Sequence, residues 1–240
     1  MMTNSETYYG IDKWRTVINL ISLALISLIC GVLILKYRRD YTYLGYIFLI
    51  LTFIFMFNGI RMINYMTWGK FKHRDRMLDL AQWKGAEKVL DVGVGKGLIL
   101  IKVAKKLTTG KVTGIDIWSN EDMLDKSKYY INKNIEIEGV KDKVRIKTQN
   151  AAAMSFNDEY FDIVLSNLCI HNIEDKVERM KAIDEMARVV KKGGKIIISD
   201  SKYMDEYEQI LLDKEFKVNV LNGCVWSTYP ALKIIEAIKQ

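Results

Sequence analysis

The sequence predicts an α/β domain with a mostly parallel sheet covered by helices on both faces, preceded by two helices that cross a membrane. Three observations lead to this prediction. From Lys88 onward, short apolar runs alternate with segments of helical periodicity, which is typical of βαβ units. A turn with three glycines, residues 93–97, separates the first apolar run from the first helical segment. Before this domain lie two uncharged stretches, residues 17–35 and 41–60.

These two uncharged stretches are long enough to span a bilayer. Residues 17–35 number nineteen and residues 41–60 number twenty, and a transmembrane helix needs about 20 apolar residues. Tyrosines gather at the start of the second stretch, as in an interfacial aromatic belt. A buried helical hairpin in a soluble protein is the alternative, which two runs of this length disfavour. A cleavable signal peptide is disfavoured because no A-x-A-like site follows the first run.

The orientation of the predicted anchor, residues 1–60, follows from the basic residues at its ends. Seven lie on the side of the two termini and three in the turn between the stretches, which favours both termini in the cytoplasm. Residues 61–85 are predicted to form a basic juxtamembrane linker or helix that meets anionic headgroups. The seven are Lys13, Arg15, Arg61, Lys70, Lys72, Arg74 and Arg76, and the three are Lys36, Arg38 and Arg39.

Length and composition allow one α/β domain of ordinary size plus this extra segment. The chain has 240 residues and a formal net charge of +7. Its three cysteines, Cys30, Cys169 and Cys224, are too widely spaced for a zinc or disulfide framework. We therefore predict no metal site and expect reduced thiols.

The domain after the anchor divides into seven strand-like and four helix-like segments. One helical stripe, from Val177 through Ile183 to Val190, has the spacing of a buried core face. The predicted strands are residues 88–91, 112–116, 144–147, 161–166, 195–199, 216–221 and 232–238, and the predicted helices are residues 98–107, 122–137, 177–190 and 204–214.

The glycine turn at residues 93–97 has the features of a nucleotide-type loop. Glycines allow a left-handed backbone and let a ligand lie against it, and the following helix N-terminus offers free N–H groups. The P-loop pattern fails because Gly97 stands where Ser or Thr is required, and the spacing G-x-G-x-G is not the dinucleotide pattern. Asp116 ends the second predicted strand, where an acid accepts hydrogen bonds from ribose hydroxyls.

With these features the chain resembles the class I S-adenosylmethionine-dependent methyltransferases over roughly residues 83–240. Residues 91–97 resemble their first motif and Asp116 their ribose-binding acid. Residues 148–152, 161–167 and 190–198 resemble the adenine-contacting segment, the fourth motif and the turn into the fifth strand. The chain is most similar to the small-molecule branch, which includes quinone C-methyltransferases. Lys192 and Asn150 depart from the more usual proline and aspartate.

The resemblance implies a methyltransferase domain at residues 86–240 with a Rossmann-like, seven-stranded sheet whose last strand is antiparallel. It implies S-adenosylmethionine as the cofactor. The ligand is expected beyond the carboxyl ends of the strands. The cofactor-binding residues it implies are Asp91, Gly93, Gly95, Gly97, Asp116, Ile117, Asn150, Ala151 and Asn167.

His171 is the candidate general base. It follows the fourth predicted strand, where the family's methyl acceptor usually lies, and a histidine can take a proton there. A helix-capping or packing role is the alternative for His171. His73, in the basic stretch, is expected at the surface.

The acceptor is expected to be a small, apolar or membrane-associated molecule, such as a quinone, a lipid or a lipophilic thiol, because the active site is tethered to a bilayer. Nucleic acid is disfavoured because residues 167–170, Asn-Leu-Cys-Ile, lack the [DN]-P-P-[YFW] motif of exocyclic-amine methylases. Protein methylation and a membrane-bound module that holds the cofactor without turnover remain as alternatives.

Overall fold

A computed structural model describes residues 7–10, 14–118, 124–224 and 227–240. The chain forms two compact units, which are taken one at a time. The first comprises His73–Gly223 and Ala231–Gln240 together with the segment before Gly10, and the second comprises Gly10–Lys72 and Cys224–Pro230. Lys13, which entered the charge comparison, and the first two residues of the helix expected at 122–137 lie outside the described residues.

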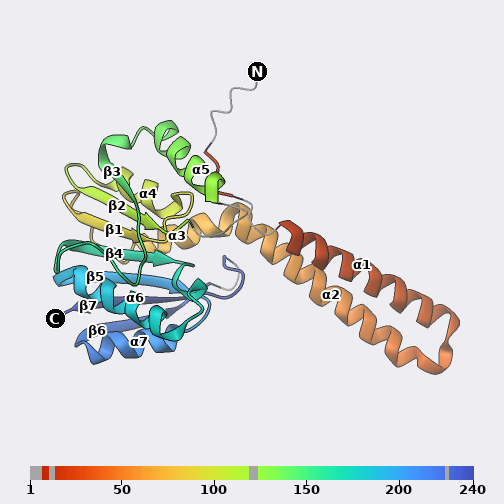
Figure 1. The fold of residues 1–240 in the computed structure, drawn as a ribbon. Helices are drawn as coiled ribbons and strands as arrows, with labels where there is room; N and C mark the ends of the chain where they lie inside the picture. Colours follow the sequence, from red (N-terminus) through yellow and green to blue (C-terminus); the bar gives the residue numbers. More distant parts are fainter. Residues whose placement is uncertain (1–6, 11–13, 119–123, 225–226) are drawn as a thin grey trace, which may run out of the picture. The chain divides into compact units, whose positions relative to one another are not determined.

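The first unit contains a seven-stranded sheet, which confirms the predicted fold (Figure 1). The strand order is β3-β2-β1-β4-β5-β7-β6. The first five strands run parallel, and β7 pairs antiparallel with both β5 and β6. The strands are β1 (Lys88–Val92), β2 (Lys111–Asp116), β3 (Val144–Thr148), β4 (Phe161–Asn167), β5 (Val190–Asp200), β6 (Phe216–Asn222) and β7 (Lys233–Lys239).

Apolar side chains of neighbouring strand residues point to opposite faces of the sheet, so the unit has two cores. Val89 joins a core with helices α4 (Leu98–Lys106) and α5 (Leu124–Ile137), and Leu90 joins a core with α6 (Lys176–Val189) and α7 (Met204–Asp213). The helical stripe predicted in α6 is only partly right. Ile183, Ala187 and Val190 are buried, but Val177 and Met180, in the first turns of the helix, are exposed.

The helix α3 (Lys70–Leu78) brings one predicted surface residue into the core. From His73 onward it belongs to the first unit. His73 is only 2% exposed, and its Nε2 lies 2.7 Å from the Ser199 hydroxyl in β5. The prediction of a surface histidine is therefore wrong. It rested on the charged neighbours in sequence, whereas the adjacent Met77 and Leu78 set the buried face of the helix.

The second unit is a helical hairpin. Helix α1 (Trp14–Tyr37) packs along α2 (Thr42–Asn64), and a 3-10 turn (Arg39–Tyr41) connects them (Figure 1). Gly31 and Gly45 lie where the helices meet, and a Cβ on Gly45 would come within 2.6 Å of Leu35. Small residues of this kind allow close approach of helices within membranes. A π-helical turn, Tyr65–Gly69, carries α2 onward into α3.

Two helical segments of the described chain, Trp14–Tyr37 and Arg39–Leu78, are long and apolar enough to cross a membrane, by length and composition alone. Few of their side chains are buried within the unit. Their outward faces carry large exposed apolar residues, including Leu25, Ile29, Ile50, Phe53 and Ile60. A soluble monomer rarely exposes a continuous apolar surface of this extent.

Candidate active site

The glycine turn joins β1 to α4 in the predicted strand–turn–helix arrangement. Gly93, Gly95 and Gly97 all have positive φ, at 77°, 49° and 86°. The backbone N–H groups of Gly93 and Val94 donate to the carbonyl of Ile115 in β2, at 2.9 and 3.1 Å. The turn is thereby fixed to the neighbouring strand. A Cβ on Gly95 would meet nothing within 4 Å, so this part of the loop borders open space.

Asp116, at the end of β2, is tied to the glycine turn. Its carboxylate accepts hydrogen bonds from the Gly95 N–H at 2.9 Å and the Trp118 N–H at 3.0 Å. Ile117 between them is 49% exposed. The structure thus brings the predicted ribose-binding acid against the predicted loop, through a side-chain contact that sequence spacing alone does not specify.

Asp91, at the end of β1, is a buried carboxyl group. It is 2% exposed, and one of its oxygens, Oδ2, is buried without a hydrogen-bond partner in the described structure. Burial raises the pKa of Asp91 to about 7; a hydrogen bond from the Leu100 backbone lowers it in part, and the charge of Asp116 raises it further. A buried oxygen that accepts no hydrogen bond costs free energy, and a donor from a bound ligand would satisfy it.

Asn150 follows β3 and shapes a turn. Its Oδ1 accepts a hydrogen bond from the Ala152 N–H at 2.9 Å, and its side chain is exposed. Ala151 lies partly buried within this turn. The preceding Gln149 N–H donates to the Asp116 carbonyl at 3.2 Å, which holds the turn beside the end of β2.

Beyond β4, the chain packs directly on the glycine turn. A Cβ on Gly93 would lie 2.2 Å from the Cys169 sulfur, so glycine is required at this contact. Burial, and then the carboxylates of Asp116, Asp200 and Asp91, hold the pKa of the Cys169 thiol far above its usual range. The thiol therefore stays protonated and is a poor nucleophile. Asn167, which ends β4, has an Oδ1 buried without a partner.

His171 lies in a 3-10 turn (Ile170–Asn172) beside a buried acid that the sequence analysis missed. Its Nδ1 is 2.5 Å from Asp200 Oδ1, and its backbone N–H donates to Asp200 Oδ2 at 3.1 Å. Asp200 is 1% exposed and ends β5. Its position at the carboxyl end of a parallel strand, after the apolar run of residues 196–198, was the signal that could have identified it.

Tyr207 in α7 is a second residue that sequence reasoning did not single out. Its hydroxyl is buried and has no partner in the described residues. Burial, followed by the charge of Asp200, raises the pKa of this phenol. Within the described ranges, no group of three or more His, Cys, Asp or Glu residues is arranged to hold a metal ion.

Comparison with known proteins finds similarity to methyltransferases. Residues 90–198 match the family described as methyltransferase domain. The ubiquinone/menaquinone biosynthesis C-methyltransferase UbiE of Vibrio campbellii is 30% identical over 147 residues, which cover 57% of this chain and 53% of that protein. The chain thus spans about half the length of the curated relatives it matches.

Solved structures share the fold at low sequence identity. A SAM dependent methyltransferase from Aquifex aeolicus has a TM-score of 0.53 and 22% identity, covering 68% of this chain and 88% of that chain. The N-methyltransferase NodS from Bradyrhizobium japonicum, solved with S-adenosyl-l-homocysteine, has a TM-score of 0.57 and 15% identity, covering 71% of this chain and 87% of that chain. These likenesses concern the fold.

Proposed function

Because the chain contains a methyltransferase domain of the class I S-adenosylmethionine-dependent kind, we propose that the protein transfers a methyl group from S-adenosylmethionine to a small, apolar or membrane-associated acceptor. The observation that carries the proposal is the link between the glycine turn and Asp116, made by the Gly95 N–H. This link aligns a loop that can receive a ligand with an acid suited to ribose hydroxyls.

The residues present fit S-adenosylmethionine. Asp91 and Asn167 each keep a buried oxygen without a partner, and both lie at carboxyl ends of adjacent strands. These acceptors suit the ammonium and hydroxyl donors of the cofactor. In this proposal the Asp116 carboxylate accepts hydrogen bonds from the ribose hydroxyls, and Ile117 lies beside it. Gly93, Gly95 and Gly97 admit the cofactor to bare backbone, and the turn at Asn150 and Ala151 contacts the adenine.

The bound cofactor would supply an activated methyl group, so the protein's task is to position the acceptor and manage its proton. His171 serves as the general base. The Asp200 carboxylate lies 2.5 Å from Nδ1, although the two groups are not aligned as a hydrogen bond in this structure; a carboxylate this close favours the tautomer that carries its proton on Nδ1, and Nε2 is then the free acceptor. A carboxylate beside the ring can orient the histidine for proton transfer.

The acceptor class is inferred from the hairpin and from the relatives. A quinone C-methyltransferase is among the similar proteins, and quinones are apolar. The two apolar helices support integration into a membrane as a two-span anchor, residues 1–60, with residues 61–85 as the basic juxtamembrane part and residues 86–240 as the methyltransferase domain in the cytoplasm.

The test is the release of S-adenosylhomocysteine by the purified full chain in an uncharged detergent, with quinones, lipids and lipophilic thiols as acceptors. Release with any of these supports methyl transfer. Binding of S-adenosylhomocysteine without release by any acceptor class would instead support the module without turnover. Release that depends on protein or nucleic acid would move the assignment to those substrates.

The role of His171 predicts a specific loss. His171→Ala should reduce turnover by about 10²–10⁴-fold, the usual contribution of a general base, while the affinity for S-adenosylhomocysteine stays within about twofold. Asp200→Asn should also lower turnover, because the ring loses the carboxylate that orients it. Asn172→Ala, in the same turn but exposed, is the matched control. Full turnover in His171→Ala would exclude the base assignment.

A further inference from the structure

Part of one face of the sheet, over strands β2 and β3, has no described helix packed on it. The twelve residues between β3 and β4, 149–160, form turns and loop only, so no helix in the described part of the chain covers the outer strands β2 and β3 on the side where α6 and α7 pack over β4 and β5. Arg145 and Lys147 in β3 point to this side, because Val144 and Ile146 pack against the core with α4 and α5. Arg145 pairs in register with Thr113 of β2.

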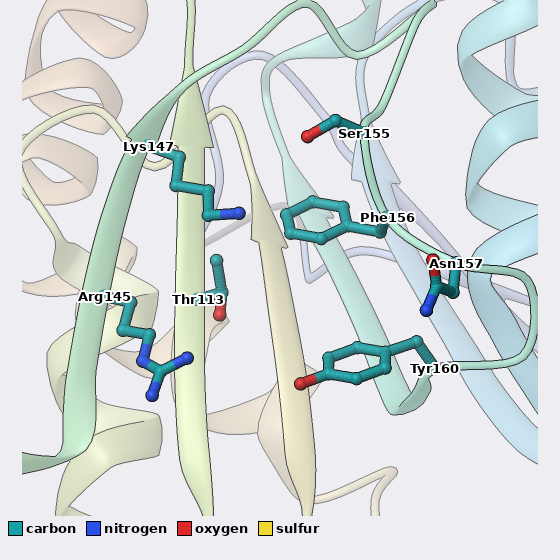
Figure 2. A pocket seen from close by; sticks show the side chains of 7 residues that line it. All are labelled: Thr113, Arg145, Lys147, Ser155, Phe156, Asn157 and Tyr160. Atoms are coloured by element: carbon teal, nitrogen blue, oxygen red, sulfur yellow. The ribbon is translucent and has the colours of Figure 1, made fainter.

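These residues line an open cavity of about 190 Å³ (Figure 2). Figure 2 shows the side chains of β2 and β3 facing those of the loop across the hollow. This volume is below the roughly 300–1,000 Å³ of sites for drug-sized ligands and suits a small group. The lining residues are Thr113, Arg145, Lys147, Ser155, Phe156, Asn157 and Tyr160, and none of them belongs to the candidate active site.

The positive charges of the cavity are not neutralised by the neighbouring loop. Asp158 pairs with Arg188 at 2.6 Å and Glu159 with Lys239 at 3.4 Å, so the two acids of the loop are engaged elsewhere. Arg145 and Lys147 have no carboxylate partner among the described residues. The Lys147 ammonium instead lies 4.8 Å from the centre of the Phe156 ring.

Hydroxyl and amide donors complete the lining. Thr113 and Tyr160 carry hydroxyl groups and Asn157 an amide. The Ser155 oxygen accepts a hydrogen bond from Gln149 at 2.6 Å, which leaves its own proton available. A guanidinium, an ammonium and several neutral donors around one small hollow form a set suited to the oxygens of a phosphate.

We propose that this cavity binds a phosphate group, with Arg145 and Lys147 as the charged donors, in a site separate from the one that holds the cofactor. The phosphate can belong to a soluble phosphomonoester or to a phospholipid headgroup. The rings of Phe156 and Tyr160 offer apolar contact to the atoms next to the phosphate. The proposal does not rest on methyl transfer.

Direct binding measurements on the full chain in an uncharged detergent test the proposal. The probes are inorganic phosphate, glycerol 3-phosphate and dihexanoyl phosphatidylglycerol below its micelle concentration. The double variant R145Q/K147Q should bind each effective probe about tenfold or more weakly. The matched control K141Q/K217Q removes the same charge from exposed positions and should stay within about twofold of the wild type. Affinity for S-adenosylhomocysteine should not change in either.

The outcomes separate the two sources of the phosphate. Saturable binding of glycerol 3-phosphate alone supports a soluble ligand, and binding of the short-chain lipid alone supports a headgroup. T113V, which removes one hydroxyl at nearly constant volume, should weaken binding about threefold and keeps the test usable if the double variant does not fold. Absence of saturable binding with all three probes, or equal losses in the double variant and its control, would overturn the proposal.

Discussion

At the scale of single residues, Asp91 combines a position in the candidate site with a cost in stability. Its pKa is about 7 in the folded protein against 3.8 for the free group. The folded chain therefore holds this proton between about pH 4 and 7 while the unfolded chain has released it. The stability that this group contributes is present below pH 4 and is lost as pH rises to 7, by up to about 4 kcal/mol.

Asp91→Asn should remove this loss of stability with rising pH, because asparagine does not titrate. We expect a higher thermal midpoint than that of the wild type at pH 8, a similar midpoint at pH 4, and weaker binding of S-adenosylhomocysteine. Thermal unfolding between pH 4 and 8, with calorimetric binding at pH 8, measures both effects. An unchanged difference between the two proteins across this pH range would contradict the assigned pKa of Asp91.

Two glycines of the same turn should respond differently to substitution. A Cβ on Gly93 would lie 2.2 Å from the Cys169 sulfur, whereas Gly95 faces open space. Gly95→Ala should lower the free energy of unfolding by about 1–2 kcal/mol, the cost of a left-handed backbone for alanine. Gly93→Ala should lower it further, because the added Cβ also overlaps the Cys169 sulfur. Thermal unfolding ranks the two, and adding Cys169→Gly should recover part of the loss in Gly93→Ala. Equal losses without recovery would argue against this packing.

Part of the geometry of the candidate site could be predicted from sequence because it follows from chain order. The glycine turn and Asp116 are neighbours through strand and helix lengths that periodicity predicts, and the structure brings them within hydrogen-bond distance. Chain order also places Asp200 at the carboxyl end of a strand, but it does not reveal which residue this acid pairs with. Its pairing with His171 depends on β5 lying beside β4 and on the turn after β4, which are contacts between segments 29 residues apart.

At the scale of elements, strands were predicted more reliably than the environment of individual helix positions. Alternating and continuous apolar runs located all seven strands, because the central strands are buried on both faces and the edge strands keep one apolar face. The exposure of Val177 and the burial of His73 were not predictable, since each depends on what covers the first turn of a helix. Local charge around His73 pointed to the surface, and tertiary packing decided otherwise.

His73 gives α3 a pH-dependent attachment to β5. Burial, and then the charge of Arg76, lower the pKa of His73 to about 4. On acidification, His73 therefore takes up a proton near pH 6.5 in the unfolded chain but only near pH 4 in the folded chain. The stability that the neutral ring contributes is complete above pH 6.5 and is lost on acidification through this window, by up to about 3 kcal/mol. This slope is opposite to that of Asp91.

His73→Gln should flatten this part of the profile. The glutamine can still bond the Ser199 hydroxyl but does not titrate, so the variant should lose less thermal stability than the wild type between pH 6.5 and 4.5. Thermal unfolding at closely spaced pH values measures the difference. Exposed Lys141→Gln serves as a control for a single substitution on the surface. A wild-type profile retained in His73→Gln would exclude the histidine as the source.

At the scale of the whole molecule, the apolar exterior of the hairpin supports the proposed location of the protein at a membrane. Gly31 and Gly45 lie between the two helices of the hairpin, while large side chains such as Ile29, Ile50 and Phe53 face outward. Water would be a poor solvent for this surface and hydrocarbon a good one. This surface therefore supports the proposed membrane anchor.

This arrangement predicts an integral protein with both ends on the cytoplasmic side. The chain should stay with membranes at alkaline pH in carbonate, because two spans bury far more apolar surface than a peripheral attachment. In a background without Cys30, Cys169 and Cys224, a membrane-impermeant thiol reagent applied outside intact cells should label Asp40→Cys in the turn. It should label Lys141→Cys only after permeabilisation. Carbonate extraction would exclude the anchor, and the reverse labelling would exclude the orientation.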